Sequence, residues 1–213
     1  GELPFELHII DGNGAPPKFW SDLELHAFDF GHSYMTAIFN APDDPLSQSY
    51  FASLAAKVGE DRAKEILGVN RHNTIIYPSC SPHTSFQQWR VIRPLSVDRT
   101  LVEIFTFRLD GAPEELLQRT FTYSNVVNSP SSIVMTDDVH VYAECQKGLA
   151  TQGGDWVSQH RNAGQDLPFS GADGGEIGVG TSELPIRNQF RAWREYMAGD
   201  VAETIPQQGN ELQ

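Results

Sequence analysis

The stretch NTIIYPSCSPHTSFQQWRVIRPLSVDRTLVEIFTFRL, residues 73–109, decides the predicted fold. It contains three extended runs, 73–79, 84–94 and 100–109, which are rich in β-branched and aromatic residues and are parted by short turn-like segments. An antiparallel pair of strands needs only a short turn, whereas a parallel pair needs a long crossover. We therefore predict an antiparallel meander of three strands.

Patterns on both sides of this stretch complete the predicted fold. Alternating residues predict strands in 23–30 and 33–39, and PFELHII near the start predicts another. Helical spacing predicts helices over 46–67, 113–127, 137–149 and 184–200. Residues 150–183 hold eight of the 18 glycines and predict a long irregular excursion. This order is typical of an α+β fold, in which a curved antiparallel sheet wraps round a long helix.

The composition limits the size of the fold and the kinds of partner. The 213 residues are 39% hydrophobic, enough for one core, so we expect a single domain over 1–213. A formal net charge of −13, with no cluster of Lys or Arg, argues against nucleic acid and against anionic membranes. The apolar runs are far shorter than the roughly 20 residues that span a bilayer. The start, GELPFELHIIDG, lacks a signal-peptide pattern. We expect a soluble, cytoplasmic protein.

The cysteines and histidines give no complete metal motif. Cys80 and Cys145 form no CxxC pair, and we expect both to be free thiols. The segment CSPH has metal-like spacing, but no second pair of ligands accompanies it, and Pro82 indicates a turn. We expect His8, His26 and His32 to be hydrogen-bonded polar residues rather than ligands.

Two adjacent acids, Asp137 and Asp138, stand at the start of the predicted helix, with Thr136 as a natural N-cap. The helix dipole favours acids there whichever way they point. At 100° per residue, Asp138 falls on the apolar stripe with Tyr142, Cys145 and Leu149, and Asp137 falls on the other side. We therefore expect Asp138 to be buried and Asp137 to be exposed. A buried carboxylate needs a counter-charge, which is either a Lys or Arg from far along the chain or a metal ion.

Four segments, in order, resemble the catalytic domain of the α subunit of Rieske-type aromatic-ring-hydroxylating dioxygenases. They are GHSYMTAIF, NTIIYPSCSP followed by QQWRVIRPLSVDRTLVEIFTFRL, SPSSIVMTDDVHVYAECQKGL and GTSELPIRNQFRAWREYM, and the resemblance covers about 31–198. It implies a helix-grip fold, like that of START and Bet v1 proteins. It also implies that Asp138, with Tyr142 four residues on, is the carboxylate of a two-His-one-carboxylate iron site, and is therefore both a catalytic and a metal-binding residue. By position it implies Tyr77, Ser79, Asn128 and Val134 as substrate-binding residues, each of which could equally be structural.

The same resemblance implies an activity, cofactors and partners. The activity is hydroxylation or cis-dihydroxylation of an aromatic ring with O2. The cofactors are mononuclear Fe(II) and a [2Fe–2S] Rieske cluster. The partners are an aromatic small molecule, a ferredoxin or reductase as electron donor, and a β subunit with trimeric assembly. The polar residues Ser79, Ser81 and Asn128 hint at a carboxylated or hydroxylated aromatic substrate.

The sequence also departs from the family pattern. It contains neither the D-x-x-H-x-x-x-x-H segment that would supply the two histidine ligands nor the cysteine and histidine pairs of a Rieske cluster. We therefore expect the C-terminal part of a catalytic domain that is inactive by itself. Two alternatives stay open: a helix-grip protein that carries a hydrophobic ligand, and a fragment with a structural or assembly role.

Overall fold

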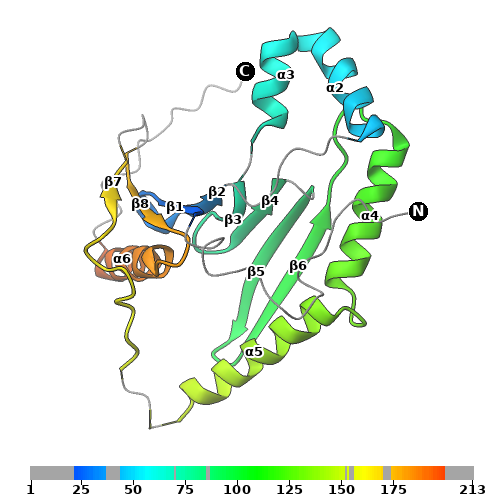
Figure 1. The fold of residues 1–213 in the computed structure, drawn as a ribbon. Helices are drawn as coiled ribbons and strands as arrows, with labels where there is room; N and C mark the ends of the chain where they lie inside the picture. The colour runs from blue at the N-terminus through cyan, green and yellow to red at the C-terminus, as the bar shows by residue number, and fades with distance from the viewer. Residues whose placement is uncertain are drawn as a thin grey trace, which may run out of the picture.

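The computed structural model describes residues 22–36, 44–69, 71–84, 87–151, 153, 156–169 and 174–199. The described strands form two antiparallel sheets (Figure 1). The first has the order β3-β2-β1-β8-β7, and the second has the order β4-β5-β6. The strands of the first sheet are β1 Glu24–Ala27, β2 Ser33–Thr36, β3 Arg71–Ile75, β7 Leu167–Pro168 and β8 Glu176–Val179. Those of the second are β4 Cys80–His83, β5 Gln88–Ser96 and β6 Arg99–Thr106.

Five α-helices and one short 3₁₀ turn occur in the described part of the chain. They are α2 Pro45–Val58, α3 Glu60–Leu67, α4 Glu114–Asn128, α5 Ile133–Leu149, α6 Leu184–Ala198 and η1 Asp29–Gly31. In Figure 1, α4 runs beside β6, α5 passes the far end of the β5–β6 hairpin, and α6 lies beside the first sheet. The antiparallel sheets and the helices confirm the predicted α+β class, and the β5–β6 hairpin confirms the pairing of the second and third strands of the predicted meander. Its first strand, predicted at 73–79, corresponds to β3, which belongs to the first sheet, and β4 takes its place beside β5.

Helix α2 shows how local sequence fixes an element. The carboxylate of Asp44 accepts hydrogen bonds from the backbone N–H groups of Leu46 and Ser47 at 3.0 and 3.1 Å, and Pro45 occupies the first helical position. Arg119 of α4 also donates to Asp44, at 2.8 Å. Burial acts to raise the pKa of Asp44, but the bonds from Ser47 and Arg119 outweigh it and lower the pKa to about 2. One residue therefore both caps α2 and joins it to α4.

Two groups of buried side chains hold the elements together. Tyr50, Ala112 and Leu116 pack between α2 and α4, with Leu46, Leu67 and Leu109 around them. In the other group, strand β1 packs against α6, and Leu25 and Ala27 of β1 and Leu184 and Ala192 of α6 are buried. The buried amide of Asn188 donates to the carbonyls of Phe28 and His32 at 2.9 and 3.1 Å, so α6 also fixes the chain on both sides of η1.

Three predicted elements need correction. The predicted helix 46–67 is two helices, because Gly59 lies between them with φ +88°. The segment CSPH is strand β4 rather than a turn. The irregular stretch 150–183 contains β7 and β8, and β8 pairs with β1 along its whole length. These short strands carry little local pattern, and their pairing depends on partners far away in the sequence. The strand predicted at PFELHII lies outside the described residues.

Candidate functional site

Helix α5 begins earlier than the sequence predicted. The hydroxyl of Ser132 accepts from the backbone N–H groups of Val134 and Met135, at 3.0 and 3.4 Å, so Ser132 is the N-cap. The prediction that Thr136 caps the helix is wrong, because its own N–H already donates to the Ser132 carbonyl. Asp137 and Asp138 therefore lie in the second turn, where the attraction of the helix dipole has fallen off.

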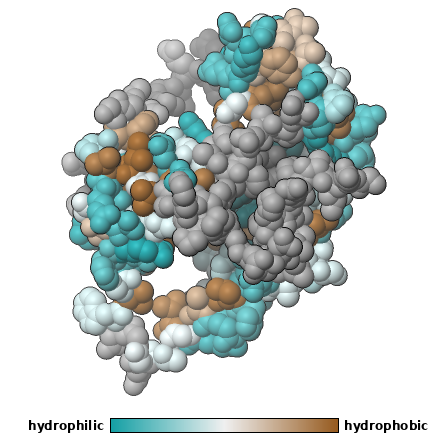
Figure 2. All heavy atoms as spheres, in the orientation of Figure 1, coloured by the Kyte–Doolittle hydropathy of each residue, from teal (hydrophilic) through white to brown (hydrophobic). Residues whose placement is uncertain are grey.

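The predicted burial of Asp138 is also wrong. Asp138 and Asp137 are both exposed, and so is Cys145, which was expected to face the core. On the same stripe Tyr142 keeps 65% and Leu149 keeps 72% of its surface exposed. Figure 2 shows hydrophobic residues along α5 at the bottom of the view. The periodicity of a helix predicts which residues share a face, but burial requires another element to cover that face.

The contacts of α5 explain this exposure. The helix packs on α4, and its Gln146 side chain donates to the Val97 carbonyl in the β5–β6 turn at 3.4 Å. These contacts lie near its two ends. An exposed carboxylate needs no counter-charge. The exposed Asp138 therefore gives no reason to expect a metal ion as its counter-charge. The assignment of Asp138 as a metal ligand depends on the family resemblance.

The structure places the four predicted substrate residues in two pairs. Asn128 ends α4 and donates to the Ser124 hydroxyl at 3.3 Å, and half-buried Val134 is the second residue of α5. Both residues therefore lie on the two sides of the α4–α5 junction. The Oδ1 atom of Asn128 is buried, and it has no hydrogen-bond partner among the described residues.

Tyr77 and Ser79 lie at the junction of β3 and β4. The backbone N–H of Tyr77 donates to Nδ1 of His32 at 3.1 Å, and its ring stacks with Tyr196 of α6 at 6.1 Å. Gly31 packs so closely on the Tyr77 ring that an added Cβ would come within 2.8 Å of it. The carbonyl of half-buried Ser79 accepts from Ile92 at 2.8 Å. These contacts give Tyr77 a packing role between η1 and α6.

The histidines and cysteines largely follow the sequence prediction. His32 accepts from Tyr77, and His26 lies 3.3 Å from Glu24 and stacks on Tyr34, so both have polar or aromatic neighbours. Cys80 and Cys145 are free thiols, as predicted. His8 lies outside the described residues.

The described residues do not assemble an iron site. No group of three or more His, Cys, Asp or Glu side chains within them is arranged to hold a metal ion. A facial iron site needs two imidazoles and one carboxylate. Asp138 alone does not provide that donor set, and we derive no step of chemistry through iron from this part of the chain.

A polar cluster, which the sequence did not predict, is formed by side chains of β3, β4, β5 and α4, of which His83 is buried and the others are half-buried. It consists of His72, His83, Arg90 and Tyr123. The rings of His72 and His83 meet edge to face at 4.2 Å. Burial, followed by the charge of Arg90, lowers the pKa of His72 to about 4. Burial, then His72 and Arg90, lowers the pKa of His83 to about 3. Burial raises the pKa of Tyr123 to about 12, although Arg90 acts against it.

The signal for this cluster is the alternation in β5. Gln88 is only 1% exposed, whereas its neighbour Trp89 is 38% exposed. At the start of the strand, Gln88 and Arg90 therefore share the inner face and Trp89 lies on the outer one, which is the reverse of the usual pattern for a half-buried strand. A prediction that places only apolar residues in the core therefore does not find this polar cluster.

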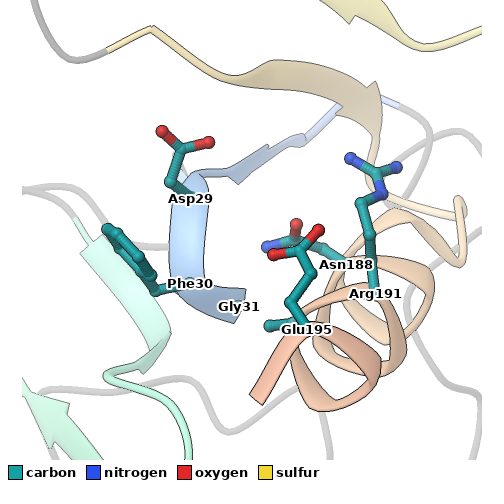
Figure 3. Close-up of a pocket in the computed structure, with 7 residues that line it drawn as sticks. Asp29, Phe30, Gly31, Asn188, Arg191 and Glu195 are labelled. Carbon is teal, nitrogen blue, oxygen red and sulfur yellow. The ribbon is translucent and has the colours of Figure 1, made fainter. Parts of the chain in front are cut away.

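A separate pocket of about 230 Å³ lies between η1 and α6 (Figure 3). It is lined by Asp29, Phe30, Gly31, Asn188, Arg191, Ala192 and Glu195. Asn188 is engaged with backbone carbonyls, and Arg191 is paired with Glu176 at 2.9 Å. None of the residues predicted from the sequence to bind iron or substrate lines this pocket.

No helix in the described residues is long and apolar enough to cross a membrane.

A scan against family models found no match. The chain is 32% identical to the α subunit of toluate 1,2-dioxygenase from Pseudomonas putida over 152 residues, 70% of this chain and 32% of that protein. It is 31% identical to the large subunit of 2-halobenzoate 1,2-dioxygenase from Burkholderia cepacia over 150 residues, 68% of this chain and 32% of that protein. The chain therefore spans about one third of the length of both relatives.

Solved structures share the fold. A naphthalene 1,2-dioxygenase variant bound to phenanthrene matches 88% of this chain and 44% of its own, with a TM-score of 0.68 and 19% identity. The naphthalene 1,2-dioxygenase of Rhodococcus sp. bound to indole matches 96% of this chain and 52% of its own, with a TM-score of 0.69 and 15% identity. The chain is therefore a homologue, over about 150 residues, of the α, or large, subunits of two aromatic-ring dioxygenases, and it shares its fold with the naphthalene 1,2-dioxygenase structures.

Proposed function

We propose that this chain is the C-terminal part of the catalytic domain of a Rieske-type oxygenase, which adds oxygen from O2 to an aromatic ring. The observation that supports the proposal most is the 32% identity to a toluate 1,2-dioxygenase α subunit over 152 residues. Because the chain spans only 32% of that relative, we propose that a longer protein supplies the two histidine ligands and the [2Fe–2S] cluster.

Within this proposal, Asp138 is the carboxylate ligand of the mononuclear Fe(II). Its exposure on α5 leaves it accessible to groups outside the described residues. Val134 lies four residues earlier on the same helix, so the two side chains share one face. The α4–α5 junction, which Asn128 and Val134 flank, is the best-supported place for the substrate. Ser79 stays a candidate for it, whereas the contacts of Tyr77 favour a packing role.

The remaining expectations are part of the same proposal. The second sheet, with α4 and α5, would form the helix-grip arrangement in the longer protein. A ferredoxin or reductase would donate electrons, and a β subunit would complete a trimeric assembly. The oxygenase would act in the cytoplasm.

The test uses a longer protein that includes the histidine motif, with one acid changed at a time. Asp138→Ala should abolish both iron binding and ring oxygenation, because it removes one of three protein ligands. Asp137→Ala is the matched control, since it is the adjacent exposed acid on the same helix, and it should keep about one Fe per chain. Elemental analysis of the purified proteins measures the iron. If Asp138→Ala retains all of its iron, Asp138 is not the carboxylate ligand of the Fe(II).

The same experiment separates the proposal from its main alternative. A hydrophobic-ligand carrier would bind aromatic compounds without releasing any oxygenated product. Product analysis of the longer wild-type protein, supplied with O2 and an electron donor, therefore distinguishes an oxygenase from a carrier.

A further inference from the structure

The pocket between η1 and α6 has a polar lining that the proposed oxygenase chemistry does not use (Figure 3). In that view Asp29 stands on η1 at one side of the pocket, and Asn188, Arg191 and Glu195 project from α6 at the other side. The volume of about 230 Å³ is below the roughly 300 Å³ at which pockets for drug-sized molecules begin. The pocket therefore suits one small group rather than a large ligand.

Asn188 is the most buried polar residue of this lining, with only 5% of its surface exposed. Its amide nitrogen donates to the carbonyls of Phe28 and His32, which uses both of its N–H groups. No described residue donates a hydrogen bond to its Oδ1 atom in return. Buried amide oxygens usually have a donor. A ligand that donates a hydrogen bond in the pocket would supply it.

The unmatched charge of the lining is negative. Glu195 is half-buried and Asp29 is exposed at the rim, and neither carboxylate has an ion-pair partner among the described residues. The guanidinium of Arg191 is already paired at 2.9 Å with Glu176, which is not a lining residue. Two carboxylates without counter-charges favour a cation in the pocket.

The arrangement of the acceptors indicates the kind of cation. A metal ion is a poor match, because no group of three or more His, Cys, Asp or Glu side chains in the described ranges is arranged to hold one. A guanidinium is flat, permanently charged and rich in N–H donors, and it is less strongly hydrated than an ammonium. Gly31 and Ala192 carry no more than a methyl group, so they leave a wall against which a flat group can lie.

We propose that the pocket between η1 and α6 binds a guanidinium group. Glu195 and Asp29 accept its N–H groups from the two sides, and Oδ1 of Asn188 accepts at the inner end. The guanidinium belongs either to a free small molecule or to an arginine side chain of another protein. Neither Asp138 nor any proposed substrate-binding residue lines this pocket, so the proposal does not depend on the oxygenase function.

The test compares methylguanidinium with methylurea, which has nearly the same shape and no charge. Each is titrated into the ¹⁵N-labelled 213-residue chain, and the amide shifts of Gly31 and Ala192 report binding at the pocket. Methylguanidinium should bind with a Kd of about 1 mM. Methylurea should bind at least about fivefold more weakly, because it gives the carboxylates no charge to pair with.

Two variants remove one charge each and keep the side-chain shape. Glu195→Gln should weaken methylguanidinium binding by about fivefold, and Asp29→Asn by about twofold, because the exposed Asp29 is more strongly screened by solvent. Asp137→Asn is the matched control, since it neutralises an exposed acid of α5 that does not line the pocket. It should bind methylguanidinium as the wild type does.

Circular dichroism checks that each variant is folded. If Glu195→Gln does not fold, the salt dependence of the wild type decides. Raising NaCl from about 50 mM to about 500 mM should weaken methylguanidinium binding and leave methylurea binding unchanged, because salt screens the interaction between charges.

A further titration distinguishes the two sources of the guanidinium. N-acetyl-L-argininamide has blocked ends, like an arginine inside a protein chain. If it binds as tightly as methylguanidinium, the pocket accepts an arginine side chain; if only methylguanidinium binds, the pocket takes a free small cation. Either result supports the guanidinium site.

Three outcomes overturn the proposal. They are no shift of Gly31 and Ala192 with methylguanidinium, equal binding of methylguanidinium and methylurea, and unchanged binding in Glu195→Gln. Binding that does not weaken with NaCl replaces the last of these where the variant does not fold.

Discussion

At the residue scale, the environment rather than the residue type decides what a titratable side chain does. Asp138, read from the sequence as a buried acid, is exposed, whereas His72 and His83 are held as neutral groups in the polar cluster. Burial disfavours the charged form of an imidazole, and a neighbouring guanidinium disfavours it further. The stability of the fold therefore depends on the protonation of these two histidines.

The first prediction concerns acid pH. The pKa of each histidine is lower in the folded chain, about 4 and about 3, than the ordinary value of 6.5, so the unfolded chain takes up protons first as the pH falls. The stability that comes from keeping both rings neutral is present above pH 6.5 and is lost below it. The free energy of unfolding should fall by about 2 kcal/mol between pH 6 and pH 5 through these two groups.

Urea unfolding of the wild type and of a His72→Gln/His83→Gln double variant measures this dependence. The double variant should show a flatter profile between pH 6 and pH 5. His140→Gln, which changes an exposed histidine of α5, is the control and should keep the wild-type slope. Parallel profiles for the wild type and the double variant would contradict the prediction.

At the scale of the element, caps and close contacts fix where each segment begins and how it packs. Ser132 and Thr136 both suit an N-cap by residue type, and the structure selects Ser132 through its bonds to Val134 and Met135. Sequence alone does not rank two such candidates within four residues, because the choice depends on where the preceding helix ends.

The second prediction tests this cap. Ser132→Ala should lower the free energy of unfolding by about 1 kcal/mol, because two backbone N–H groups of α5 lose their acceptor. Thr136→Ala should have a smaller effect, since Thr136 lies inside the helix and its hydroxyl donates to the Pro130 carbonyl. Chemical unfolding of both variants gives the comparison, and a larger loss in Thr136→Ala would restore Thr136 as the cap.

The third prediction concerns the contact between η1, Tyr77 and α6. Gly31 has φ +84°, and an added Cβ would lie 2.8 Å from the Tyr77 ring and 3.0 Å from Cβ of Ala192. Gly31→Ala should therefore cost about 2 kcal/mol or more, from backbone strain and overpacking together. Gly164→Ala, at φ +79° with nothing within 4 Å of an added Cβ, isolates the backbone strain and should cost less. If thermal unfolding shows the same loss of stability in both variants, overpacking at Gly31 makes no contribution to the loss.

At the scale of the whole molecule, the chain holds a fold that it shares with larger oxygenase subunits, but only part of the proposed chemistry. It spans 32% of the length of its curated relatives, and its described residues hold no cluster of metal ligands. A carboxylate with water binds hard cations weakly and does not select iron. The proposed activity therefore belongs to a longer polypeptide.

The fourth prediction follows from that ligand set. The 213-residue chain, purified and incubated with Fe(II) under anaerobic conditions, should retain no stoichiometric iron and should oxygenate no aromatic compound. The longer protein with the histidine motif is the positive control and should retain about one Fe per chain. One tightly held iron in the short chain would mean that it contains ligands which neither the sequence nor the described structure identifies.

The sequence by itself determined the α+β class, the β5–β6 hairpin, most of the helices, the two free thiols and the resemblance to dioxygenase α subunits. These features follow from local periodicity and from short segments in a fixed order, which need no knowledge of distant contacts. Only the tertiary structure decided that β8 lies between β1 and β7 in the first sheet, that the stripe of α5 is exposed, and that Arg90 lies close to His72, His83 and Tyr123. Each of these depends on which elements meet in space. The burial and the pKa of a residue are set by the neighbours that the tertiary structure brings to it, and not by its position in the sequence.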